Sequence, residues 1–241
     1  QGQGQGQGWW QTPFANLRDH WRIQSFRVLC LQGCFGTFAY QVMHFSTLWF
    51  QYCGLSNWEA GSVAALQHAG GLLGALVGGT LADALARRDP LHGRQYVAQC
   101  SVACAVPVLL LVFGALPRSP ASYRSFCALM FLFGFSLGMC VPGVNRPLLS
   151  EVAPKNQLAS IMAWETTFEQ VFSMTLGPTL VAGLSTWYGY RSSELRIEQM
   201  LPADRQQNVD ALAQTIKVLA GLAYCCVVAG YTLLHWTYEG D

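Results

Sequence analysis

Six long stretches almost free of charged side chains constrain the fold of this sequence more than any other feature. An α-helix needs about 20 mostly apolar residues to cross the hydrocarbon core of a bilayer. The qualifying stretches lie near residues 26–52, 59–85, 95–117, 123–146, 157–188 and 211–237. A soluble protein has little reason to repeat that length six times. The sequence therefore predicts an all-α membrane protein with six transmembrane helices.

The composition supports this interpretation and divides the chain in two. Charged residues make up 11% of the sequence, against roughly 25% in a soluble domain. The net charge of +1 offers no basic surface for nucleic acid. Residues 1–24 open on the low-complexity run QGQGQGQG and continue as an expected juxtamembrane helix. Residues 25–241 form the expected six-helix transmembrane domain.

Motifs for enzymatic or metal chemistry are absent from the sequence or lack their structural context. The nine cysteines form no CxxC pair, and no Cys/His set has zinc-ligand spacing. There is no phosphate-binding glycine loop and no haem motif. GFSLG matches the nucleophile-elbow pattern around Ser136, but that motif needs a strand-to-helix turn and here lies within an apolar stretch. We expect no enzyme, no metal and no cofactor.

Small residues recur at helical spacing within two of the expected spans. Gly70, Gly74 and Gly78 are four apart, and Gly134 and Gly138 repeat that spacing. A second row consists of Gly71, Ala75 and Gly79. Small residues at this spacing allow the backbones of two membrane helices to approach closely. The pattern predicts tightly packed helices but does not by itself indicate transport.

The basic residues predict the orientation of the chain, because cytoplasmic loops carry an excess of Lys and Arg. With six spans, both termini lie on one side of the membrane. That side carries Arg18, Arg22, Arg27, Arg87, Arg88, Arg94, Arg146 and Lys155. The other side carries Arg118, Arg124, Arg191, Arg196 and Arg205. We therefore expect both termini in the cytosol.

Two acidic residues in the fifth span are the leading functional candidates, because ionisable groups inside a membrane are costly. Glu165 and Glu169 lie four apart, on one face of a helix. A buried carboxyl group can take up and release protons, which suits proton coupling. The alternative is that Glu169 only forms a stabilising hydrogen bond to a neighbouring helix.

Weaker candidates lie in the first two spans. Gln41 and His44 are in the first span, and Gln67 and His68 are in the second. Each could line a polar cavity, although a single histidine in a helix more often serves packing. Arg146 and Lys217 lie at span ends, and we expect both to extend toward the membrane interface.

The segment GGTLADALARRDPLHGR, between the second and third spans, resembles the G-x-L-a-D-r-x-G-R-r signature of the major facilitator superfamily. The segment contains an insertion, and Ala84 stands where a basic residue is usual. Both features resemble the degenerate copy of this signature in the family's C-terminal half. The matching positions are Gly79, Asp83, Arg87, Arg88, Gly93 and Arg94.

A second segment agrees with this resemblance. Glu151 and Pro154 match the family's E-x-x-P-x-x-x-R loop, although Asn156 and Gln157 stand where an Arg is common. Residues 164–170 are similar to the F-D-R-x-F-E-G motif of a poorly characterised plant and protist branch. Glu169 is retained there, while Thr166 replaces the Arg.

The resemblance implies helices seven to twelve of a twelve-helix transporter that works by alternating access. It implies a cavity lined by the first, second, fourth and fifth spans. It also implies a cytosolic latch in which Asp83 pairs near the start of the fifth span. The expected function is transport of a small solute, with or without protons. Its expected partner is the missing six-helix half or a second copy.

One alternative stays open at this point. The six helices could form a stand-alone membrane protein that binds, regulates or dimerises with a partner rather than transporting a solute. The substrate and the membrane in which the chain resides are not indicated by the sequence.

Overall fold

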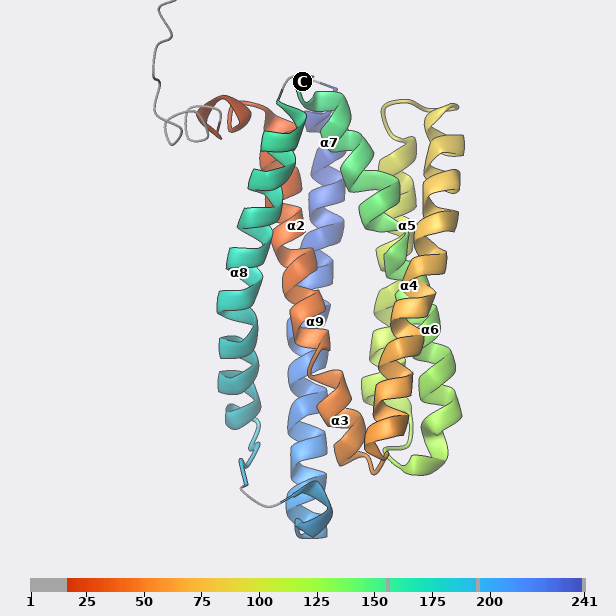
Figure 1. Ribbon diagram of the computed structural model, residues 1–241, viewed down its shortest axis with the longest axis vertical. Coiled ribbons are helices and arrows are strands. Elements are labelled where there is room, and N and C mark those ends of the chain that lie inside the picture. Colours follow the sequence, from red (N-terminus) through yellow and green to blue (C-terminus); the bar gives the residue numbers. More distant parts are fainter. Residues whose placement is uncertain (1–16, 155–156, 194–195, 240–241) are drawn as a thin grey trace, which may run out of the picture.

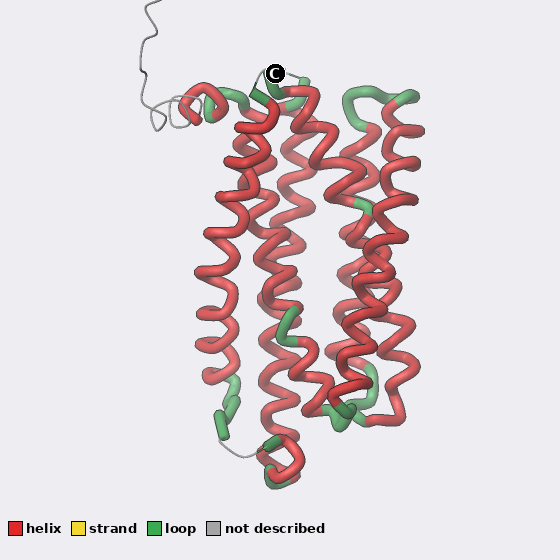
Figure 2. Tube along the Cα trace, in the orientation of Figure 1, coloured by secondary structure: helices red, strands yellow, loops and turns green. Residues whose placement is uncertain are grey.

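The computed structural model describes residues 17–154, 157–193 and 196–239. Throughout this part of the chain the regular structure is helical (Figure 2). Of the expected tail and juxtamembrane helix, the Gln-Gly run lies outside the described residues. Residues 17–20 are helical and lead into the first long helix.

The first expected span consists of two helices. α2 (Gln24–Met43) ends before a short break at His44 and Phe45, and α3 (Ser46–Tyr52) follows. α4 (Asn57–Ala86) is a continuous helix of 30 residues. Its start is fixed by a capping box, in which the Ser56 hydroxyl accepts from the Glu59 N–H and the Glu59 carboxylate accepts from the Ser56 N–H.

The third and fourth spans each contain a π-helical segment. α5 (Gly93–Leu110) continues into η1 (Leu111–Ala115). A 3₁₀ turn, η2 (Pro120–Ser122), precedes α6 (Tyr123–Gly138). The fourth span then passes through η3 (Val141–Asn145) into α7 (Arg146–Val152), so it extends beyond the expected end near residue 146.

The last two long helices are α8 (Leu158–Trp187) and α9 (Pro202–Thr237), with the 3₁₀ turn η4 (Ile197–Gln199) between them. α9 begins well before the expected position near residue 211. Its first turns are polar, so a hydropathy criterion does not detect them as part of the helix. Pro202 at the first position and Asp204 in the first turn favour a helix start there.

Four helical segments of the described chain are long and apolar enough to cross a membrane. They are Asn57–Ala86, Gly93–Ala115, Pro120–Val152 and Pro202–Thr237. α2 and α8 are more polar, since α2 contains Gln32 and α8 contains Glu165 and Glu169. α8 nevertheless runs alongside the other long helices over most of the bundle's length, and α2 runs beside them over about half of it before α3 continues (Figure 1).

The long helices pack as two groups of three. α2 contacts α8 and α9, whereas α4 contacts α5 and α6, and α5 joins the groups by packing on α9. The start of the described chain, the α4–α5 turn and the end of α9 all lie at one end of the bundle (Figure 1). We call this the signature end, because residues 79–94 reach it.

The glycines of α4 and α6 form a backbone-to-backbone seam, which confirms the close packing expected from their spacing. A β-carbon at Gly70 or Gly74 would fall within 3.0 Å of the backbone of α6. The same holds for Gly134 and Gly138 against the backbone of α4. By contrast, Gly79 of the second row has no heavy atom within 4 Å of that position among the described residues.

A polar cavity and the signature loop

A cavity of about 510 Å³ lies between the two helix groups. Its wall is mostly apolar, with a small set of polar side chains. This is typical of a small-molecule site. The polar and charged side chains that line it are Gln32, Thr37, Tyr40, Gln67, His68, Cys140, Asn145, Arg146, Glu165, Glu169, Tyr224 and Tyr231.

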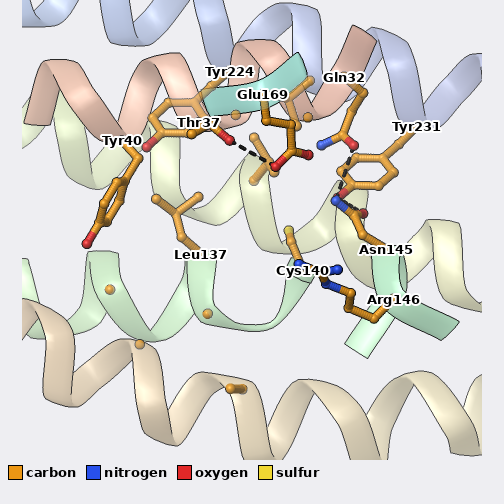
Figure 3. A pocket seen from close by; sticks show the side chains of 18 of the residues that line it. Gln32, Thr37, Tyr40, Leu137, Cys140, Asn145, Arg146, Glu169, Tyr224 and Tyr231 are labelled. Atoms are coloured by element: carbon orange, nitrogen blue, oxygen red, sulfur yellow. Dashed lines mark hydrogen bonds between the residues drawn. The ribbon is translucent and has the colours of Figure 1, made fainter. Parts of the chain in front are cut away.

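Glu169 of α8 projects across the cavity toward α2 (Figure 3). The Thr37 hydroxyl donates to Glu169 Oε2 at 3.3 Å. Glu169 Oε1 lies over Gly33, where a β-carbon would come well within 3.0 Å of the carboxyl group. Gly33 therefore provides the space that this carboxyl group occupies. Among the described residues, Glu169 forms no ion pair within 4 Å.

Glu165 lies one helical turn earlier and has a different environment. Its side chain is 3% exposed, and its Oε2 is 3.8 Å from Arg146 NH1. The Arg146 side chain is 43% exposed, so it lies between the buried Glu165 carboxylate and the open part of the cavity. Removing one partner from a buried pair would leave an uncompensated charge. Glu165 and Arg146 therefore form the charged pair of the cavity.

The inward position of Arg146 corrects the expectation that it extends to the membrane interface. Arg146 follows η3, where the helix is locally widened, and precedes Pro147, which cannot donate a backbone hydrogen bond. π-helical segments often occur at functional sites. Here the segment turns Asn145 and Arg146 into the cavity. In the sequence, the polar pair Asn145 and Arg146 at the end of an apolar run, followed by Pro147, is the pattern that could have indicated this inward position.

Three buried polar side chains connect α2, η3 and α9 at the cavity (Figure 3). The Tyr231 hydroxyl donates to Asn145 Oδ1 at 2.7 Å, and Asn145 Nδ2 donates to Gln32 Oε1 at 3.3 Å. All three are less than 5% exposed. Because a buried amide is costly without partners, this chain of hydrogen bonds fixes how α9, η3 and α2 meet.

The other sequence candidates divide between the cavity and its surroundings. Gln67 and His68 line the cavity from α4, as Glu165 and Glu169 do from α8. Gln41 and His44 are not among its lining residues. Gln41 packs against the position of Gly177 on α8, and the ring of His44 contacts Tyr40. Positions 32, 33, 36, 37 and 40 form the cavity face of α2; Gln41 lies beside this face, and His44 lies just beyond the end of the helix.

At the signature end, Arg94 joins residues that are far apart in the sequence. Its NH1 lies 2.9 Å from Asp83 Oδ1, and its NH2 lies 3.5 Å from Glu151 Oε1. NH1 also lies 3.4 Å from the carbonyl oxygen of Gly143, which Pro147 cannot satisfy. The Tyr238 hydroxyl donates to Glu151 Oε2. Among the described residues, the ion-pair partner of Asp83 is therefore Arg94; residues 155–156, just before the expected start of the fifth span, lie outside them.

The remaining signature residues have different surroundings. Arg87 and Arg88 are exposed, and neither forms an ion pair within 4 Å to another described residue. Gly93 approaches the backbone of Leu85 so closely that a β-carbon would not fit. Pro154 is exposed just after α7 and ends that helix.

Comparison with models of known protein families matches residues 4–178 to the Major Facilitator Superfamily. The chain belongs to this superfamily. The match covers most of the chain, including the signature loop and both acidic residues of α8. No curated protein and no solved structure matches the chain.

Membership in the superfamily implies transmembrane transport rather than catalysis. The chain is therefore an integral membrane protein with several membrane-spanning helices. This agrees with the half-open, partly polar cavity between the helix groups, a common place for a solute site.

Proposed function

We propose that this chain is the C-terminal six-helix half of a secondary transporter, which moves a small solute by alternating access and couples that movement to protons at Glu169. In this proposal α2 and α3 together form the first span, and α8 forms the fifth. The solute binds in the cavity between the helix groups. The missing N-terminal half, or a second copy of the chain, closes the other side.

The observation that carries the proposal is the contrast between Glu169 and Glu165. Glu165 has a cation as its neighbour, because Arg146 lies 3.8 Å away. Glu169 faces the same cavity, and among the described residues its hydrogen-bond partner is the Thr37 hydroxyl. A carboxylate in a membrane without a paired cation is costly. Taking up a proton removes this cost, so Glu169 is the group best suited to exchange protons with the cavity.

The remaining polar residues have supporting roles in this proposal. Arg146 is the cation beside Glu165 and offers hydrogen-bond donors to a polar group of the solute. Tyr40 on α2 and the pair Gln67 and His68 on α4 supply further polar contacts to the solute. The wall is otherwise apolar and suits a compact solute with few polar groups.

The signature end completes the proposal. The Arg94 cluster stabilises one arrangement of the α4–α5 turn and of the end of α7, and breaking it shifts the population of transporter states. In this proposal the signature end and both termini lie in the cytosol, which the distribution of the basic residues supports. Gly79, which meets no described atom, faces the other half of the transporter.

The test uses the full-length protein that contains this chain, reconstituted into liposomes. Solutes are first screened for thermal stabilisation of the protein, and those that bind are tested for uptake with and without an imposed pH gradient. Glu169→Gln is expected to abolish pH-driven accumulation but to preserve exchange of labelled solute across the membrane. Full pH-driven accumulation in that variant would exclude Glu169 as the proton carrier.

Glu198→Gln is the matched control, because Glu198 is exposed in the turn before α9. It removes one carboxylate without reaching the cavity and should leave accumulation unchanged. If neither binding nor exchange of any solute is found in the parent protein, the transport proposal itself fails.

A further inference from the structure

Two histidines that are 143 residues apart meet at the signature end of the bundle, outside the cavity. His92 lies in the α4–α5 turn, just before α5, and His235 lies in the last turn of α9. Their Nδ1 atoms are 2.9 Å apart, with ring centroids 4.9 Å apart. At this distance one hydrogen atom must lie between the two nitrogens, since two bare lone pairs would repel each other.

The Glu239 carboxylate indicates which nitrogen of the neutral His92 ring carries the hydrogen. His92 Nε2 lies 3.4 Å from the Glu239 carboxylate. An ionised carboxylate only accepts hydrogen bonds, so we assign the hydrogen of the neutral His92 ring to Nε2, beside this carboxylate. In the neutral ring this leaves Nδ1 bare.

A chain of hydrogen bonds imposes the same state on His235. The Thr232 hydroxyl donates to the carbonyl of Val228 at 2.9 Å, and therefore accepts from Gln99 Nε2 at 3.0 Å. This orients the Gln99 amide so that its Oε1 faces His235 Nε2, at 3.5 Å. His235 Nε2 therefore also carries a hydrogen, and its Nδ1 is bare in the neutral ring.

We propose that His92 and His235 form a proton-binding pair that holds a single shared proton between their Nδ1 atoms and ties the end of α9 to the α4–α5 turn. The proton is an additional one, because both neutral rings already carry theirs on Nε2. Binding makes the pair one imidazolium and one imidazole. A second proton would place two like charges 2.9 Å apart and is disfavoured. The two rings thus share one positive charge.

The surroundings of the pair suit a single positive charge. Glu239 follows α9 and faces the His92 ring, while the Asp89 carboxylate in the α4–α5 turn accepts from the backbone N–H of His92 at 3.0 Å. From α5, the Tyr96 ring packs against His235 with centroids 4.9 Å apart. Glu239 is also adjacent to Tyr238, whose hydroxyl binds Glu151 of the Arg94 cluster. Loss of the proton therefore weakens the attachment of α9 beside the signature loop.

The test is a nitrogen NMR titration of the full chain in lipid nanodiscs with isotope-labelled histidine, over about pH 5 to pH 8, where imidazoles change charge. We expect the His92 and His235 signals to change together. In His92→Asn the titration midpoint of His235 should move by about 1–3 pH units. Independent titration of the two rings, or one ring with a bare Nε2 throughout the range, would overturn the proposal.

Two variants separate proton sharing from a merely structural contact. Asn is a good helix N-cap, and in His92→Asn its amide N–H can reach the bare Nδ1 of His235 without titrating. Gln99→Met removes the acceptor on His235 Nε2, which frees His235 to carry its hydrogen on Nδ1. Both variants should keep the end of α9 attached to the α4–α5 turn, but this attachment should no longer depend on pH. Hydrogen exchange in residues 231–237, corrected for the intrinsic exchange rate, measures the attachment.

His44→Asn is the matched control, because His44 is an exposed histidine at the end of α2. It should leave the exchange profile of residues 231–237 as in the parent chain. If Gln99→Met instead keeps the full pH dependence, the pair does not share a proton. Stoichiometric binding of Zn²⁺ that is lost in His92→Asn would make this a metal site and would likewise overturn the proposal.

Discussion

The carboxyl group of Glu169 on α8 lies directly over Gly33 on α2, in space that a β-carbon at position 33 would fill. This arrangement allows two helices to approach at the point where a carboxyl group faces the cavity. It makes a glycine, rather than a polar residue, the most sensitive neighbour of Glu169.

Gly33→Ala is therefore expected to displace the Glu169 carboxyl group and to break its hydrogen bond from Thr37. The carboxyl stretching band of Glu169, assigned by its loss in Glu169→Gln, should shift in the infrared spectrum of the reconstituted protein. Gly36→Ala on the same face is the comparison, since a β-carbon there meets other atoms only at 3.8 Å, an ordinary contact. An unshifted band in Gly33→Ala would show that the Glu169 carboxyl group does not occupy the space over Gly33 in the parent protein.

Gly74→Ala is expected to destabilise the α4–α6 seam by about 1–3 kcal/mol, because its methyl group would displace the backbone of α6. The free energy of unfolding in mixed micelles measures this effect. Gly61→Ala on the same helix meets no atom within 4 Å and should be neutral, or stabilising by up to about 1 kcal/mol. Equal effects of the two substitutions would contradict the seam.

Arg94→Gln is expected to lower stability more than Asp83→Asn or Glu151→Gln. Asp83 and Glu151 are 57% and 43% exposed, so each pair contributes less than about 1 kcal/mol. Arg94 is 13% exposed and serves both carboxylates and the carbonyl of Gly143. Melting temperatures at low and high salt measure the order. A larger effect of Asp83→Asn would mean that Asp83 has a further partner.

We expect the segment before α2 to detach from α8 at acidic pH, because it is held there by the buried side chain of His20. Its side chain is 1% exposed, and Nε2 lies 3.3 Å from the Ser160 hydroxyl on α8. Burial lowers the pKa of His20 below its ordinary value of 6.5, while Asp19 opposes this shift. The folded state therefore favours the neutral ring. Its contribution to stability is full above pH 6.5 and is lost as the pH falls from there through the lowered pKa.

Hydrogen exchange in residues 17–23, corrected for the intrinsic rate, should therefore rise as the pH falls below about 6.5. His20→Gln, which cannot titrate, should remove this dependence. Asp19→Asn should shift it to lower pH, because the opposing charge is gone. A pH-independent exchange profile in the parent chain would show that His20 stays docked when it is protonated.

The α4–α6 contact could be predicted from the sequence because it depends on a local rhythm. Residues four apart lie on one helix face, so the glycines at 70, 74 and 78 indicate a surface without side chains before any partner is known. The same reasoning identified Glu165 and Glu169 as neighbours. Both features are periodic within one helix.

The position of Arg146 and the pairing of His92 with His235 could not be predicted in the same way. Arg146 points inward because η3 alters the helix just before it, and a hydropathy pattern contains no information on a π-helical segment. The two histidines are brought together by α5 packing against α9. Such a contact depends on the arrangement of the whole bundle, and one sequence gives no spacing that indicates it.

The glycine seam also determines where the solute preference of such a protein can change over evolutionary time. Where α4 meets α6, backbone touches backbone, so almost any new side chain disrupts the bundle before it alters recognition. On α2 and α8 the cavity is instead shaped by side chains that project into open space. Mutations there can alter recognition without disturbing the seam, so related transporters can diverge in the solutes they bind while the α4–α6 backbone contact stays unchanged.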